Sequence, residues 1–288
     1  MGRLRDNMFA DLHTHSIYSD GLYSPDEICR LAKARGLSLL SITDHDTLTG
    51  EEVKRAAAKR HGLSYVTGWE ISAYEREQKI HILGYGCDLG EGYVSFMEER
   101  KKGAKLRAED CVQKLQKLGV PVTMEEVCMQ RSSSDLPIHT MHIARAAATH
   151  LGVSDSEVYL QYLSYGKPAN SGLGRPTPQD AIECIHACGG IAVIAHPGRI
   201  TMDFDEKEKT IKKLKGLGAD GIEAVYSTHT KEETEYFLHL SKQLDLLVTG
   251  GSDTHFEGMG GNDLYQRRIG TPSFTPSQEL LERLKIIK

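Results

Sequence analysis

Histidines and acidic residues recur together in short motifs that are spread over most of this 288-residue chain. Imidazole and carboxylate groups, with no cysteine among them, favour zinc, manganese or iron over calcium. In an extended strand, His13 and His15 point to the same side, so both can contact one ion. The candidate metal ligands are His13, His15, Asp20, His45, Glu70, His81, His196, Asp253 and His255. So many ligands exceed what one ion requires, and the sequence therefore predicts two or three ions.

A centre of this kind favours phosphate chemistry. Three divalent cations facing three carboxylates would leave a local charge of about +3 and attract a phosphate group. The formal net charge of the whole chain, in contrast, is −5. Clustered cations also lower the pKa of a bound water toward about 7 and stabilise the displaced oxygens. The ligand set therefore predicts hydrolysis of a phosphate ester.

Each motif by itself has a simpler explanation. The pair His13 and His15 could belong to ordinary packing, and Asp44-His45-Asp46 before a helix could cap that helix. Glu70 alone would be a solvated acid, and His196-Pro197 alone would be a turn. Metal binding is favoured because these motifs recur at the ends of successive predicted strands.

The pattern of apolar runs predicts a chain of alternating strands and helices, and hence an α/β fold. The expected strands are Phe9–His13, Leu37–Thr43, Ser64–Thr67, Lys79–Tyr85, Ile191–Ala195, Gly221–Val225 and Leu246–Thr249. The expected helices are Pro25–Arg35, Leu48–Arg60, Pro178–Cys188, Glu206–Leu217 and Lys231–Leu244. In parallel α/β barrels the carboxyl ends of the strands meet on one face, so ligands distant in sequence can become neighbours.

The middle of the chain interrupts this alternation. Residues 95–174 contain no convincing strand, and their pattern predicts a charged helix over Ser95–Leu118 and shorter helices after it. We therefore expect two parts of one domain, residues 1–94 and 175–288, with an inserted helical subdomain between them.

The motifs resemble those of the PHP family, named for polymerase and histidinol phosphatase domains, and in particular its stand-alone bacterial phosphoesterases. In chain order they are DLHTHSIYSDG, TDHDT, GWEI, HILGY, CGGIAVIAHP, GIEA and GGSDTH. HIARA and YGKPA, in the middle block, resemble the helical insertion of that subgroup. The resemblance implies a distorted (β/α)7 barrel whose site is capped by the inserted subdomain.

The resemblance also implies a metal centre and a reaction. His13, His15, Glu70 and Asp253 would bind the first ion, and Glu70 would bridge to a second ion. His81 and His196 would also bind the second ion, whereas Asp20, His45 and His255 would bind the third. The ions would be manganese, or else zinc or iron(II). A metal-bridging hydroxide would attack phosphorus in a small phosphorylated metabolite, such as a nucleoside 3′,5′-bisphosphate.

The expected substrate contacts are Lys167, Arg199 and His142, with His229 as a catalytic proton donor or phosphate ligand. Each also has a structural alternative, such as a solvated loop or helix face. The subgroup usually carries Arg-Pro-His where this chain has Thr140-Met141-His142. A phosphate-binding arginine is therefore missing at position 140, which puts the usual substrate in doubt and leaves the roles of His139 and His142 open.

Alternative functions remain open at this point. A cyclic sugar phosphate is one alternative substrate, and short RNA cleaved by a 5′-3′ exoribonuclease is another. A C–N hydrolase built on a similar barrel is disfavoured because no strand end offers a lysine. A catalytically inactive domain is disfavoured because all the expected ligands are present.

Composition excludes several other classes. The chain has no run of about 18 apolar residues, so no membrane span is expected, and its N-terminus lacks the apolar core of a signal peptide. Acidic residues outnumber basic ones, 40 to 35, so duplex DNA is not an expected partner. The six cysteines contain no CxxC pair, which favours reduced thiols in the cytoplasm. No obligate protein partner is expected.

Overall fold

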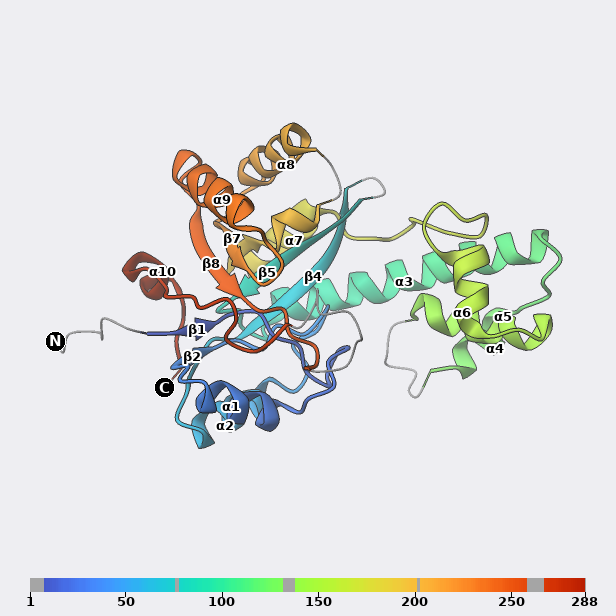
Figure 1. Cartoon of the computed structure of the whole chain (residues 1–288). Helices are drawn as coiled ribbons and strands as arrows, with labels where there is room; N and C mark the ends of the chain where they lie inside the picture. Colours follow the sequence, from blue (N-terminus) through green and yellow to red (C-terminus); the bar gives the residue numbers. More distant parts are fainter. Residues whose placement is uncertain (1–7, 76–77, 132–137, 201–202, 258–266, 288) are drawn as a thin grey trace. The chain divides into compact units, whose positions relative to one another are not determined.

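The computed structural model describes residues 8–75, 78–131, 138–200, 203–257 and 267–287 (Figure 1). The chain divides into two compact units, one made of residues 1–93 and 177–288, and the other of residues 94–176. The mixed α/β class that the sequence predicted is confirmed. None of the helices in the described part of the chain has the length and apolar composition of a membrane span.

The first unit begins with short parallel strands that alternate with helices. β1 (Ala10–Asp11), β2 (Leu39–Leu40) and β3 (Ser64–Tyr65) form a three-stranded parallel sheet within the described chain. The connections contain α1 (Pro25–Ala34) and α2 (Glu51–Arg60). Helix α1 begins where the sequence predicts, because Ser24 and Glu27 form a capping box and Pro25 occupies the first helical position.

The other sheet of this unit is mixed. Its strands, in both chain and spatial order, are β4 (Gly68–Glu75), β5 (Gln78–Tyr85), β6 (Ile191–Ile194), β7 (Gly221–Tyr226) and β8 (Leu247–Gly251). β5 runs antiparallel to both β4 and β6, whereas β6, β7 and β8 are parallel. Of the described α-helices, those of the first unit that follow β5 and lie wholly within it are α7 (Pro178–Ala187), α8 (Phe204–Gly216), α9 (Lys231–Gln243) and α10 (Gln278–Arg283).

Two features of this sheet differ from the sequence prediction. Glu70 comes after the predicted strand, which is β3, but it lies inside a further strand, β4, that the sequence pattern did not predict. His81 lies on an antiparallel strand, so the first half of β5 reaches the edge where its neighbours end. The error arose because β4 and β5 are buried on both faces over much of their length and lack the polar alternation of an ordinary hairpin.

Backbone hydrogen bonds connect the two sheets near the strand ends. The amide of Leu12 donates to Gly250 at 3.1 Å, and the amide of Asp253 donates to His13 at 2.7 Å. On the other side, the amide of Glu70 donates to Asp44 at 3.2 Å. These contacts bring candidate ligands from both sheets together. The expected closed barrel is not confirmed, because the described strands form two separate sheets.

Apolar side chains from both sheets hold the first unit together. One cluster includes Leu12, Leu83, Val193 and Phe274, all buried. Another lies where α1 and α2 pack on β2 and β3, and includes Ile28. Each such side chain stabilises the fold by about 1.5–3 kcal/mol relative to exposure. Packing of these apolar clusters therefore fixes the strand ends that carry the candidate site.

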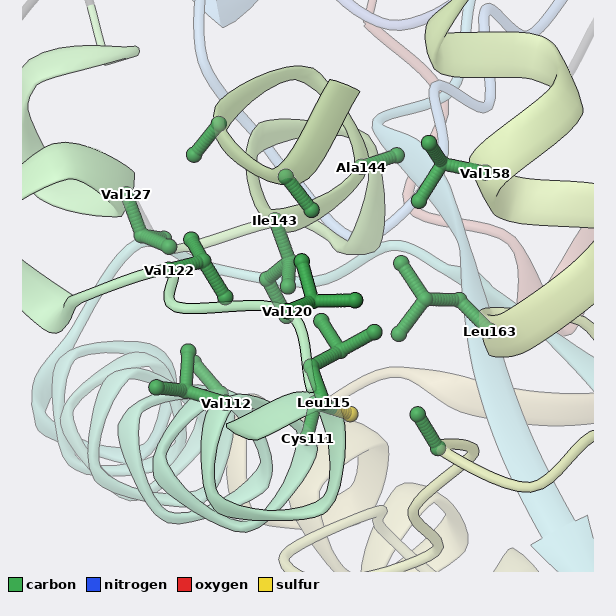
Figure 2. Close-up of a cluster of buried hydrophobic side chains, with 14 of the residues drawn as sticks. Cys111, Val112, Leu115, Val120, Val122, Val127, Ile143, Ala144, Val158 and Leu163 are labelled. Atoms are coloured by element: carbon green, nitrogen blue, oxygen red, sulfur yellow. The ribbon is translucent and has the colours of Figure 1, made fainter. Parts of the chain in front are cut away.

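The second unit is helical. Its elements are α3 (Glu91–Lys117, which begins in the first unit), α4 (Met124–Met129), α5 (Thr140–Leu151), α6 (Asp155–Val158) and a π-helical turn at Tyr159–Leu163. Figure 2 shows its own buried core, in which Leu115 of α3 lies near Val120 and Leu163. Gly103 and Gly174 allow close backbone contact, since a Cβ at Gly103 would lie 2.2 Å from the Gly174 carbonyl oxygen.

Candidate metal centre

The structure brings the nine predicted ligands into three overlapping groups at the strand ends of the first unit. His13 and His15 follow β1, His45 follows β2, and Asp253 and His255 follow β8. Glu70 and His81 point from the β4–β5 hairpin, and His196 follows β6. Close approach requires a small residue at one point: a Cβ at Gly251 would lie 2.3 Å from the Cβ of His13.

The first group comprises the donor atoms His13 Nε2, His15 Nε2, Glu70 Oε2 and Asp253 Oδ1. The two imidazole nitrogens are 3.1 Å apart. Glu70 Oε2 lies 3.2 Å from the nitrogen of His13 and 3.3 Å from that of His15. Asp253 Oδ1 lies 3.5 and 3.0 Å from the same nitrogens. Tetrahedral ligands of a zinc-sized ion are about 3.3 Å apart, so these atoms fit one cation.

The second group is built on the other oxygen of Glu70. Its Oε1 lies 2.6 Å from His81 Nδ1 and 2.8 Å from His196 Nε2, and those nitrogens are 3.2 Å apart. The carboxylate of Glu70 thus presents one oxygen to each group. His45 lies between the two groups: it is grouped with Glu70 and His81, but its Nδ1 lies 3.1 Å from Glu70 Oε2, the oxygen that faces the first group.

The third group comprises His15, Asp20, His45 and His255. It is looser than the others: Asp20 lies 3.3 Å from His255 Nε2, 3.8 Å from His45 Nε2 and 3.9 Å from His15 Nδ1. The side chain of Asp20 is 58% exposed, whereas those of Glu70 and Asp253 are almost fully buried. An ion held here would be the most accessible to solvent.

Polar atoms of these groups lack hydrogen-bond partners. Within the described part of the chain, the buried atoms without one include His15 Nδ1, His81 Nε2, Glu70 Oε2 and Asp253 Oδ1. Leaving such atoms buried and unsatisfied costs about 1–3 kcal/mol each, more when they are charged. A cation coordinated by these atoms would remove that cost, so the donor set fits divalent metal ions.

The ionisation states of the first group also favour cation binding. Burial opposes ionisation of Glu70, but His81 and the other histidines hold its pKa well below the ordinary value. Burial also lowers the pKa of His15, but the adjacent carboxylates of Asp253 and Glu70 outweigh it and raise that pKa to about 9. The ionised carboxylates therefore hold a proton on His15, and a cation would take the place of that proton.

Comparison with known proteins identifies the family. The PHP domain model matches residues 11–123. A 5′-3′ exoribonuclease of Haemophilus influenzae is 35% identical over 248 residues, covering 85% of this chain and 89% of that protein. A 3′,5′-nucleoside bisphosphate phosphatase of Chromobacterium violaceum is 32% identical, covering 88% of this chain and 90% of that protein. The chain belongs to the PHP family.

A solved structure agrees with this assignment. An amidohydrolase from Chromobacterium violaceum, with bound sulfate and no metal, superposes with a TM-score of 0.71 at 29% identity and 97% coverage of both chains. This PHP protein is a metal-dependent phosphoesterase, that is, a phosphoric ester hydrolase.

Two buried carboxylates of this PHP centre were not singled out from sequence. Asp11 accepts hydrogen bonds from the backbone amides of His13, Ser252 and Gly270, and so ties β1 to the segments after β8. Glu223, in the middle of β7, contacts His13 and the backbone of His196. A carboxylate inside an otherwise apolar strand was the signal that could have found Glu223.

The outer oxygen of Asp253 is held by three donors. Asp253 Oδ2 accepts hydrogen bonds from Tyr226 Oη at 2.7 Å, from Arg199 at 3.2 Å and from Arg267 at 2.5 Å. Arg199, an expected phosphate ligand, is thus located beside the first group, with its side chain 48% exposed. Arg267 was missed because nothing in its local sequence distinguishes it from a surface arginine.

His229 contacts backbone through both ring nitrogens. Its Nδ1 donates to the Ala224 carbonyl at 3.0 Å, and its Nε2 accepts from the Gly198 amide at 3.1 Å. The ammonium of Lys207 donates to the Gly198 carbonyl at 3.2 Å. Together these side chains support the Pro197–Arg199 turn, which carries Arg199.

The remaining expected substrate contacts lie in the second unit. Lys167 is exposed in the segment after the π-helical turn. His142 is half-buried, and its Nδ1 accepts from the His139 amide at 3.1 Å, which caps α5. Burial, and then the neighbouring His139, lower the pKa of His142.

Proposed function

We propose that the enzyme removes a phosphate from a small nucleotide such as a nucleoside 3′,5′-bisphosphate. The observation that carries this proposal is Glu70, whose two oxygens face two different groups of imidazoles. Such a carboxylate is suited to bridge two cations that act on one phosphate. The 32% identical nucleoside bisphosphate phosphatase supports the choice of substrate.

The proposed ligands are the nine residues of the three groups, His196 included, and the proposed ions are two or three Mn²⁺, with Zn²⁺ or Fe²⁺ as alternatives. Bound cations would supply an activated water and neutralise charge on the phosphate oxygens. Glu70 and Asp253 would provide the negative charge that retains the cations. Arg199 would donate to a nonbridging phosphate oxygen from the rim, and His229 would keep its turn in place.

Several expectations stay predictions. They are the distorted barrel, a capping role for an inserted subdomain at residues 95–174, substrate contacts from Lys167 and His142, and proton donation by His229. A cytoplasmic location also stays a prediction, supported by cysteines that are free in the part of the chain that the structure describes.

Phosphate release from a substrate panel tests the proposal. The panel contains nucleoside 3′,5′-bisphosphates, mononucleotides, a cyclic sugar phosphate and short 5′-phosphorylated RNAs, each with Mn²⁺. We expect the highest kcat/KM for a nucleoside bisphosphate. Release from none of these substrates by Mn²⁺-loaded protein would refute the proposal.

Lys167→Ala provides a test of substrate binding. If Lys167 contacts a phosphate, KM should rise about tenfold while kcat changes little, and Lys231→Ala, on an exposed part of α9, serves as the matched control. Equal KM values for the wild type and Lys167→Ala would assign Lys167 to solvent.

A 5′-3′ exoribonuclease acting on short RNA is the second candidate, favoured by the 35% identical relative of that name. Tyr159 and Tyr165 are exposed and could stack on bases. This activity predicts a kcat/KM that increases with RNA length and falls steeply with salt. A rate independent of both would favour the small substrate.

A further inference from the structure

Glu223 joins two of the candidate ligands from different strands. It lies within β7, and its side chain is completely buried. Its Oε1 lies 2.9 Å from Nδ1 of His13, and its Oε2 accepts a hydrogen bond from the backbone amide of His196 at 2.8 Å. One carboxylate therefore contacts the end of β1 and the end of β6 at the same time.

The contact with His13 determines which nitrogen of that ring can bind a cation. An ionised carboxylate only accepts hydrogen bonds, so Nδ1 of His13 must carry a proton and donate it. The neutral ring then has its lone pair on Nε2, the atom that faces His15, Glu70 and Asp253. Partners of this kind fix the tautomer and orientation of metal-binding histidines in general.

The contact with His196 supports an unusual backbone conformation. His196 has φ 25° and ψ 63°, a conformation that residues with a side chain rarely adopt. This conformation directs its Nε2 to within 2.8 Å of Glu70 Oε1. The hydrogen bond from its amide to Glu223 contributes to holding the residue in that state.

We propose that Glu223 is a positioning residue of the metal centre: it sets the tautomer of His13 and the backbone of His196, so that both present a nitrogen to the cations. The inference rests on the proposed ligand set. It goes beyond that set because Glu223 is not among the candidate ligands and would act through His13 and His196.

Glu223→Gln provides the test, because the amide has the same shape but only one acceptor. If the amide oxygen stays with His13, its NH₂ group faces the amide of His196, which is also a donor. If the amide turns round, it donates to Nδ1 of His13 and moves the ring proton to Nε2, where it blocks a cation. Either orientation disturbs one of the two histidines.

We expect Glu223→Gln to bind Mn²⁺ about 10–100-fold more weakly than the wild type, as measured by calorimetric titration of metal-free protein. Elemental analysis after gel filtration should find fewer ions per chain. Glu51→Gln is the matched control: Glu51 is also buried, and its contacts run to Arg55 and Tyr65. Mn²⁺ affinity within twofold of wild type for Glu223→Gln would overturn the proposal.

A second measurement does not depend on the variant being folded. In Zn²⁺-loaded wild-type protein with ¹⁵N-labelled histidine, the proton of His13 should reside on Nδ1, and a proton on Nε2 would overturn the proposal. The two hypotheses also fail in different ways. Wild-type protein that binds no ions would refute the proposed function, whereas normal metal binding by Glu223→Gln would refute only the role of Glu223.

Discussion

At the scale of single residues, two carboxylates of the site, Glu70 and Asp253, each contact several other side chains. Glu70 contacts His13, His15 and His45 through one oxygen, and His81 and His196 through the other. Asp253 faces the imidazoles with Oδ1 and three donors with Oδ2. Losing one such carboxylate removes a ligand and also leaves its partners without compensating charge.

Asp253→Asn should therefore lower kcat by more than about 100-fold. The amide keeps an oxygen but loses the charge that a cation needs. Activity with Mn²⁺, metal content and the circular dichroism spectrum should be measured together, and the fold should be retained. Wild-type turnover in a variant free of metal would contradict the ligand assignment.

Metal binding should release protons. In the metal-free protein the pKa of His15 is raised to about 9, because Asp253 and Glu70 outweigh the effect of burial. Mn²⁺ must displace that proton, so affinity should fall by up to about tenfold for each pH unit below 9 and each proton released. Calorimetry in buffers of different ionisation enthalpy measures the proton count, and a count of zero at pH 7 would contradict this prediction.

The raised pKa of His15 also makes the stability of the metal-free protein depend on pH. A raised histidine pKa stabilises the folded state fully below the unfolded value of about 6.5, and the contribution is lost as pH rises through about 9. Metal-free protein should therefore become less stable over this range, while metal-loaded protein should not.

At the scale of elements, a buried ion pair fixes the loop after β1. The ammonium of Lys54, on α2, lies 2.6 Å from Asp44, and both side chains are completely buried. Asp44 also accepts from the backbone and hydroxyl of Ser16 and from the hydroxyl of Ser19. Burial would raise the pKa of Asp44, but Lys54 and Ser16 hold it below its ordinary value. Helix α2 thus stabilises the segment that carries Asp20.

Lys54→Met should destabilise the protein by about 3–5 kcal/mol at pH 7, because it leaves the charge of Asp44 buried and unpaired. The double variant Lys54→Met/Asp44→Asn should recover much of that loss in urea unfolding. The single variant should also gain stability between pH 7 and pH 5, as Asp44 becomes protonated. A single variant as stable as the wild type at pH 7 would show that the pair contributes nothing.

At the scale of the whole molecule, the chain has separate cores in its two units. The cluster around Leu115, Val120 and Ile143 lies entirely within residues 94–176. The candidate ligands lie entirely in the other unit. Stability of the second unit and metal binding by the first should therefore respond to different substitutions.

Leu115→Ala should destabilise the second unit by about 2–5 kcal/mol, the usual effect of a large-to-small change in a core. Mn²⁺ content and affinity should stay as in the wild type, because the candidate ligands belong to the first unit, which has a core of its own. Limited proteolysis followed by mass spectrometry would locate cleavage within residues 94–176. Loss of bound Mn²⁺ in this variant would contradict the separation.

Much of this protein could be determined from its sequence alone. The candidate ligands, most strands and the helical middle block follow from local patterns, since capping residues and apolar periodicity act over a few positions. Only the tertiary structure decided the rest. It decided the antiparallel direction of β5, the three hydrogen bonds to Asp253 Oδ2 and the contacts of Glu223 with two histidines. These features depend on groups up to 210 residues apart. No local pattern encodes such pairings, because they arise when whole strands pack.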